Sequence, residues 1–113
     1  MKESDIVTLH IALNADTRDF ITAKDFALMK PSTILINTAR GPVVNETALA
    51  EALKQGQIAA AATDVYGTEP PLKPENPLLG APNLIMLPHI GFATEEAFLL
   101  RLGIVVRNIE ELF

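Results

Sequence analysis

Residues 33–37 read Thr33-Ile34-Leu35-Ile36-Asn37, a nearly continuous apolar run that ends in a polar residue. Such a run is typical of a strand in a parallel sheet, because helices then cover both faces and neither face needs polar side chains. Pro31 precedes the run and Gly41-Pro42 follows it, so both sides carry residues that interrupt regular structure. We therefore predict a strand at this position, buried on both faces.

Three further segments have the composition of strands. Residues 6–11, 58–65 and 84–87 are short and rich in β-branched or small apolar side chains. An extended loop over residues 66–83 separates the last two, and it carries Pro70, Pro71, Pro74, Pro77 and Pro82. Proline donates no backbone hydrogen bond, so this density of proline excludes a regular helix or a central strand there.

Helical patterns occupy the remaining intervals. Thr22-Ala23-Lys24-Asp25 has the form of a capping box and opens a helix through Met29. Asn45 is a typical N-cap for a helix over residues 46–55, and Thr94 caps a long apolar helix that runs to the C-terminus. The alternation of strands and helices predicts an α/β fold: the second half of a doubly wound, Rossmann-like parallel sheet with flanking helices.

Composition excludes several classes of protein. The chain has 113 residues and a net charge of −5, with no basic run, which argues against nucleic-acid binding. It has no cysteine, so it has neither disulfides nor thiolate metal sites, and its start lacks the apolar core of a signal peptide. We expect a single cytoplasmic domain. Its 49% hydrophobic content means either that both sheet faces are covered or that an apolar surface needs a partner.

Polar residues follow the predicted strands at their carboxyl ends. Arg40 follows the strand at 33–37, and His89 follows the last strand. Asp64 lies at the end of the strand at 58–65, and Glu69 comes five residues later. The carboxyl ends of parallel strands meet at one edge of the sheet, which is where ligands bind in open α/β folds. We therefore expect these four residues to lie close together.

Each residue also has a purely structural interpretation when taken alone. Arg40 could be an exposed turn residue, Asp64 a turn cap and Glu69 a solvated charge. His89 could be a structural histidine, and we expect His10, inside the first strand, in the core or behind a ligand contact. The histidines show no zinc-binding spacing, so no metal site is expected. The functional interpretation therefore depends on the four residues occurring together.

Four segments of the chain form a specific combined pattern. They are Ile36-Asn37-Thr38-Ala39-Arg40-Gly41-Pro42-Val43-Val44-Asn45-Glu46, Ala62-Thr63-Asp64-Val65-Tyr66-Gly67-Thr68-Glu69-Pro70, Asn76-Pro77-Leu78-Leu79 and Leu87-Pro88-His89-Ile90-Gly91. In this order they closely resemble the D-isomer-specific 2-hydroxyacid dehydrogenase family. The resemblance places residues 1–113 in the C-terminal part of that family's NAD-binding domain.

The resemblance implies a role for each residue at the sheet edge. Arg40 would bind the carboxylate and carbonyl of the substrate, and His89, paired with Glu69, would be the acid/base. The implied cofactor is NAD (or NADP), with Asp64 facing the nicotinamide carboxamide. Further contacts to the dinucleotide are implied for Ile11, Ala12, Thr17, Thr38, Ala39 and Gly91. The chemistry agrees, because a forked guanidinium suits a carboxylate held at two points and a neighbouring carboxylate favours the imidazolium.

The resemblance also sets an expected function and its alternative. The resemblance implies that the family's Gly-rich phosphate loop and separate substrate domain would precede Met1, and the chain has no Gly-x-Gly-x-x-Gly. We therefore expect the phosphate-binding βαβ half and the substrate domain to be absent from it. It would then be an oxidoreductase fragment. The parent enzyme would transfer a hydride between NAD(P)H and a small 2-oxo/2-hydroxy acid of the glyoxylate, hydroxypyruvate or phosphoglycerate type. The alternative is a non-catalytic protein-interaction module of the same fold, either truncated or co-repressor-like.

Two positions depart from the family pattern, which usually has proline at the position of Ala12 and a small residue at that of Phe92. Phe92 would either narrow the nicotinamide side of the pocket or mark a subgroup. The apolar excess and the expected absence of the first βαβ half predict an uncovered sheet edge and an uncovered C-terminal helix. We therefore expect a homo-oligomer or a swapped dimer.

Overall fold

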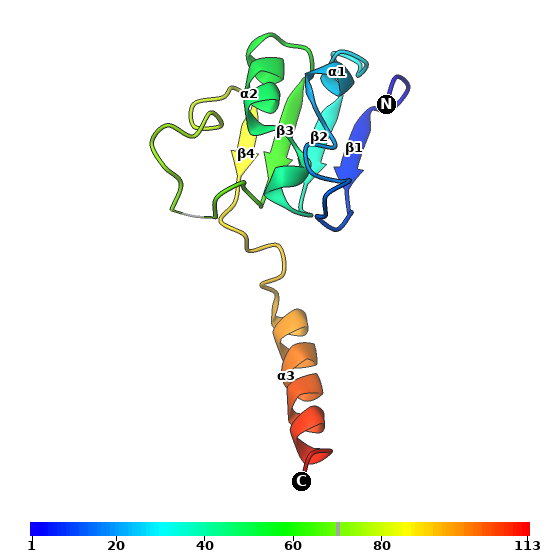
Figure 1. Ribbon diagram of the computed structural model, residues 1–113, viewed down its shortest axis with the longest axis vertical. Helices are drawn as coiled ribbons and strands as arrows, with labels where there is room; N and C mark the ends of the chain where they lie inside the picture. The colour runs from blue at the N-terminus through cyan, green and yellow to red at the C-terminus, as the bar shows by residue number, and fades with distance from the viewer. Residues whose placement is uncertain (70) are drawn as a thin grey trace.

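The computed structural model describes residues 1–69 and 71–113 (Figure 1). Pro70, part of the predicted loop, lies outside the described residues. The elements in chain order are β1 (Ile6–Leu9), α1 (Ala23–Phe26), β2 (Ile34–Asn37), the 3-10 helix η1 (Gly41–Val43), α2 (Glu46–Lys54), β3 (Ala60–Thr63), β4 (Leu84–Met86) and α3 (Glu95–Glu110). The predicted alternation of strands and helices is confirmed.

The four strands form one parallel sheet in the order β1-β2-β3-β4. One row of paired residues runs across it through Val7, Leu35, Ala61 and Leu84. Because all strands point the same way, their carboxyl ends share one edge, as predicted. The α/β class with a Rossmann-like parallel sheet is therefore confirmed.

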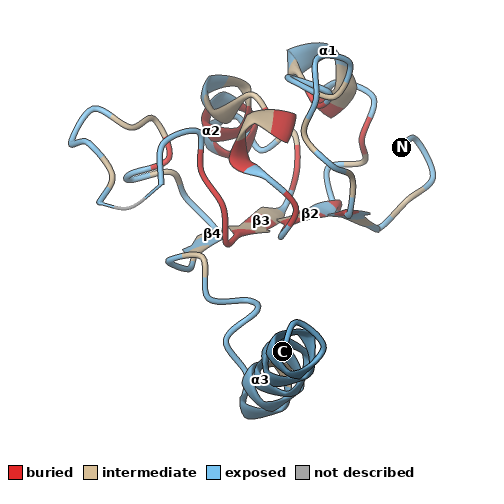
Figure 2. Cartoon of the chain, turned by 60° about the horizontal axis from the view of Figure 1, so that its bottom comes forward, coloured by how far each residue is buried: buried red, intermediate tan, exposed pale blue. Residues whose placement is uncertain are grey.

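In the part of the chain that the structure describes, helices cover one face of this sheet and leave the other bare (Figure 2). Figure 2 shows α1 and α2 on the same side of the sheet, where Leu35 and Ala61 are buried. On the opposite face Ile6 is 61% exposed and Ile85 63% exposed. The prediction that the 33–37 strand is buried on both faces is wrong, since Ile34 lies on the bare side. An apolar run indicates a strand that can be covered on both faces, but it does not determine whether a helix packs on the second face.

The helix ends follow the predicted caps. The Asp25 carboxylate accepts hydrogen bonds from the Thr22 backbone N–H at 2.9 Å and from the Thr22 hydroxyl at 2.8 Å. The Thr22 backbone bond is the main reason that the pKa of Asp25 is lowered. The helix ends earlier than predicted, at Phe26 rather than Met29, and continues as turns. The Asn45 side chain accepts a hydrogen bond from the Ala48 N–H at 3.0 Å, which confirms it as the cap of α2.

The long C-terminal helix forms where it was predicted, with Thr94 accepting from the Ala97 N–H. It extends away from the sheet on the side opposite α1 and α2 (Figures 1 and 2), and none of its residues is buried. Its apolar stripe is exposed: Phe98, Leu102, Val105, Val106, Ile109 and Leu112. Across residues 1–69 and 71–113, no helix has the length and apolarity to cross a membrane.

Candidate functional site

Two adjoining pockets lie at the carboxyl edge of the sheet. The first, of about 590 Å³, is lined by His10, Ile11, Ala12, Leu13, Thr38, Ala39 and Arg40. The second, of about 410 Å³, is lined by Thr38, Arg40, Asp64, His89, Gly91, Phe92 and Arg101. Thr38 and Arg40 line both, so the two pockets form one continuous candidate site.

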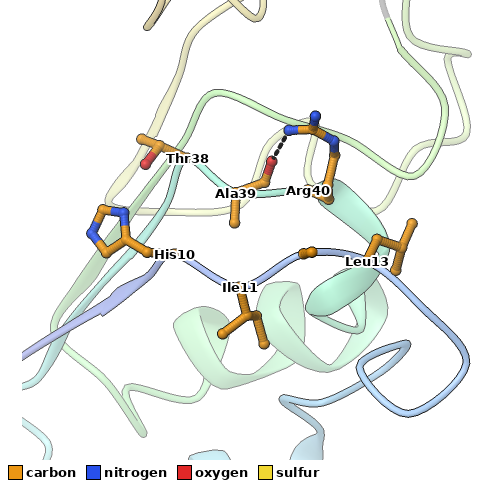
Figure 3. Close-up of a pocket in the computed structure, with 7 residues that line it drawn as sticks. His10, Ile11, Leu13, Thr38, Ala39 and Arg40 are labelled. Atoms are coloured by element: carbon orange, nitrogen blue, oxygen red, sulfur yellow. Dashed lines mark hydrogen bonds between the residues drawn. The ribbon is translucent and has the colours of Figure 1, made fainter.

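The turn after β2 forms the boundary between the pockets. Buried Asn37 organises it, because its amide donates to the Arg40 carbonyl at 3.1 Å and its oxygen accepts from the Ala39 N–H at 3.1 Å. The Arg40 guanidinium donates to the Ala39 carbonyl at 2.6 Å, drawn as the dashed line in Figure 3. The guanidinium is thereby fixed at the pocket while most of its donors stay available.

Gly41 brings this turn against the end of β3. A Cβ at Gly41 would overlap the backbone of Tyr66, so only glycine allows the approach. The Tyr66 hydroxyl donates to the Leu87 carbonyl at 2.7 Å, which ties the exit of β3 to the exit of β4. Burial of this phenol is the main cause of its raised pKa.

Asp64 holds the turn that carries His89. Its carboxylate oxygens accept from the Ile90 N–H at 2.8 Å and from the Gly91 N–H at 2.7 Å. The side chain is buried, and a Cβ at Gly91 would lie 2.8 Å from its Oδ2. His89 has a φ of 57°, in the left-handed region, which non-glycine residues occupy mainly where the surroundings enforce it. The two bonds to Asp64 supply that enforcement.

His89 and Glu69 form the predicted pair. His89 Nδ1 lies 3.0 Å from Glu69 Oε2, with the two side chains 37% and 50% exposed. Because Nδ1 faces the carboxylate, Nε2 is the ring nitrogen that remains for a ligand. Phe92 packs edge-on against the imidazole, with the ring centroids 6.2 Å apart.

A carboxylate on α2 anchors the proline-rich loop. Glu46 accepts from the Gly67 N–H at 2.6 Å and from the Asn76 side-chain amide at 3.1 Å. These bonds hold the segment before Glu69 close to the folded body. Glu46 lies within the quoted sequence pattern, but the pattern alone does not reveal this anchoring contact.

The structure brings most of the predicted site residues together. Arg40, Asp64 and His89 line one pocket, Glu69 contacts His89, and the first pocket includes Ile11, Ala12, Thr38 and Ala39. Gly91 lines the second pocket. Thr17 lines neither, since its hydroxyl donates to the Ala12 carbonyl at 2.7 Å and accepts from the Asn14 N–H at 2.8 Å. It shapes the loop beyond β1.

Three residues of the site differ from the predictions or were missed. The core interpretation of His10 is wrong: β1 ends at Leu9, and His10 is exposed and lines the first pocket, as does Leu13 (Figure 3). Leu13 follows the strand without a distinguishing pattern. Arg101 also lines the second pocket, because the segment before α3 brings that helix alongside His89. No spacing in the sequence reveals the direction in which α3 leaves the sheet.

The residues present fit a dinucleotide. The first pocket combines apolar side chains (Ile11, Ala12, Leu13 and Ala39) with polar ones (His10, Thr38 and Arg40). Such a mixed lining at the ends of β1 and β2 suits a dinucleotide, which has flat rings and ribose hydroxyls. Ile11, Ala12, Thr38 and Ala39 would hold it there. Asp64 lines the second pocket. Each of its carboxylate oxygens accepts one backbone N–H and still has a lone pair that could accept a hydrogen bond from an amide.

Comparisons with known proteins agree with this arrangement. The family profile described as "D-isomer specific 2-hydroxyacid dehydrogenase, NAD binding domain" matches residues 1–91. A hydroxypyruvate reductase of Blautia hydrogenotrophica is 41% identical over 98% of this chain and 34% of its own length. A glycerate dehydrogenase of Methylorubrum extorquens is 46% identical over 97% of this chain and 35% of its own length.

A solved structure extends the match. An acyclic imino acid reductase in complex with NADPH and D-Arg superposes with a TM-score of 0.88 at 38% identity, over 99% of this chain and 35% of that one. The chain thus spans about a third of the length of these three proteins. The match of sequence and fold shows that the chain belongs to the NAD-binding domain family of the D-isomer-specific 2-hydroxyacid dehydrogenases.

Proposed function

We propose that this chain supplies the carboxylate-binding and acid/base residues for oxidoreduction of a small 2-oxo/2-hydroxy acid of the glyoxylate, hydroxypyruvate or phosphoglycerate type. Residues 1–113 would form the C-terminal part of the NAD-binding domain. The observation that carries the proposal is the second pocket, where Arg40 and His89 face one space and Glu69 contacts His89. The relatives named hydroxypyruvate reductase and glycerate dehydrogenase support this substrate class.

Each residue has a distinct chemical task in this proposal. Arg40 holds the substrate carboxylate by charge-assisted hydrogen bonds and thereby orients the adjacent carbonyl. His89 holds a proton at Nε2 and delivers it to the carbonyl oxygen during reduction, while Glu69 at Nδ1 stabilises the charged ring. NAD(P)H, when bound, supplies the hydride. Asp64 keeps the His89 turn in place and would face the carboxamide of a bound nicotinamide.

The first test measures binding of the acid. Calorimetric titration with glyoxylate and hydroxypyruvate should show that Arg40→Met weakens binding about tenfold or more, because a charge-assisted bond is lost. Arg18→Met is the matched control, since Arg18 is exposed and lines neither pocket. Equal acid affinity in the wild type and Arg40→Met would remove Arg40 from the site.

The second test measures turnover. In the complete enzyme, assayed as NADH oxidation by glyoxylate or hydroxypyruvate, His89→Gln should lower kcat by about 10²–10⁴-fold, because the proton donor is lost. NADH should bind as before, since His89 does not line the first pocket. An unchanged kcat would exclude His89 as the acid/base.

The exposed apolar surfaces support a further part of the proposal, a homo-oligomer. The sheet face that carries Ile6, Ile34 and Ile85 is bare, and the apolar stripe of α3 is exposed along its whole length. A second copy of the chain offers both surfaces at once, so that the α3 stripe of one copy can cover the bare sheet face of the other.

A further inference from the structure

The second pocket contains one cation more than the proposed chemistry uses. Arg101, in the second turn of α3, lines it together with Arg40 and His89. Arg40 and His89 already account for binding a 2-oxo acid and for moving its proton. Arg101 therefore needs a separate explanation.

Arg101 is held at the pocket by an aromatic residue. Its Cζ lies 4.9 Å from the centroid of the Phe92 ring, in cation–π geometry. The same ring also packs in edge geometry with His89 and with Phe98 of α3, with centroid separations of 6.2 and 6.1 Å. Phe92 thus connects the position of Arg101 to that of the proposed acid/base residue.

The charges around the two guanidinium groups are not balanced within the protein. Among residues 1–69 and 71–113, ion pairs join Lys30 to Asp5, Lys54 to Glu51 and His89 to Glu69, and none includes Arg40 or Arg101. The one acidic side chain that lines the pocket, Asp64, is engaged by the two backbone N–H groups. In a chain of net charge −5, this is a local concentration of available cations.

We propose that Arg101 binds a second anionic group on the substrate, at the end opposite the carboxylate held by Arg40. This inference rests on the proposed function. The substrate would then be a 2-oxo acid with a terminal carboxylate or phosphate. A pocket of about 410 Å³ is large enough for such a molecule. Arg101 acts as a specificity-determining residue: it adds a charge-assisted bond for acids with two anionic groups and none for simple 2-oxo acids.

The test compares ligands that differ only in the terminal group. The full chain is titrated by calorimetry with 2-oxoglutarate against 2-oxopentanoate, and with phosphohydroxypyruvate against hydroxypyruvate. We expect the wild type to prefer the doubly anionic member, and Arg101→Met to reduce that preference about tenfold. The ligand pair for which Arg101→Met loses the preference identifies the terminal group as carboxylate or phosphate. Arg107→Met, on the same exposed helix but outside the pocket, should keep the preference.

Two outcomes separate this inference from the proposed function. If Arg40→Met weakens all four ligands but Arg101→Met leaves both preferences intact, the role of Arg101 is wrong and the proposed function stands. If Arg40→Met has no effect on any ligand, the proposed function fails. Equal weakening of both members of each pair by Arg101→Met would overturn the inference, because the residue would then attract anions without recognising the terminal group.

Discussion

Gly41 determines how closely the Arg40 turn approaches the end of β3. Because a Cβ there would overlap the Tyr66 backbone, Gly41→Ala should displace one of the two segments and lower the free energy of unfolding by about 1–3 kcal/mol. Urea denaturation measures this loss. Gly103→Ala is the control: a Cβ at Gly103, in exposed α3, meets no neighbouring atom, so the substitution should not lower stability. Equal stability of the two variants would contradict the observed packing.

The conformation of His89 depends on Asp64. An amide in place of the carboxylate can accept only one of the two N–H bonds from Ile90 and Gly91, so Asp64→Asn should lower the free energy of unfolding by about 1.5–3 kcal/mol. The amide resonances of Ile90 and Gly91 should shift most. Asp16→Asn, at an exposed loop position, should change neither property. Unshifted resonances in Asp64→Asn would show that something else holds the turn.

At the scale of elements, α1 has only four residues and depends on its cap. The lowered pKa of Asp25 means that the unfolded chain takes up a proton first as pH falls. The ionised carboxylate therefore stabilises the fold fully above the unfolded-state pKa, near 3.8, and this contribution is lost as pH falls through the lower, folded-state pKa.

Asp25→Asn should consequently cost about 1 kcal/mol at neutral pH, the difference between a charge-assisted and a neutral hydrogen bond. The difference in the free energy of unfolding between wild type and variant should shrink below pH 3.8. Denaturation curves recorded across acidic pH measure it, with Glu3→Gln as an exposed control. A difference independent of pH would show that the charge of Asp25 does not stabilise the cap.

Local signals explain which elements could be predicted from sequence. The caps at Thr22, Asn45 and Thr94 and the four apolar runs depend on neighbouring residues, and each marks an element in the structure. Parallel pairing then brings Arg40 and His89 to one edge, which is why that part of the site was predictable.

The rest of the site depends on three-dimensional contacts that leave no local pattern. The direction of α3 after Gly91 decides whether Arg101 reaches the pocket, and the early end of β1 places His10 outside the strand. The partners of Asp64 are backbone N–H groups, which any residue type can supply. A side-chain pattern cannot reveal such partners.

For the whole molecule, the 49% hydrophobic content is divided between a buried core and an exposed apolar surface. The helix-covered side of the sheet forms the core around Leu35 and Phe26. The bare side and α3 remain exposed, with Ile85 at 63% and Leu102 at 61%. Apolar areas of this extent on a small domain favour association, because burying them in an interface releases water from both copies.

The proposed homo-oligomer predicts a mass of at least twice 12.2 kDa in light scattering. Leu102→Asp together with Val105→Asp places two charges in the α3 stripe and should shift the mass to that of a monomer, because a buried unpaired charge disrupts an apolar interface. Leu100→Asp is the matched control, since Leu100 lies outside the stripe on the same helix and is 68% exposed. A monomeric wild type, or equal dissociation by the control, would show that α3 is not the interface.

Ile85→Asp should also dissociate the oligomer if α3 covers the bare sheet face. An effect of the α3 variant alone would instead indicate helix–helix association between the two copies.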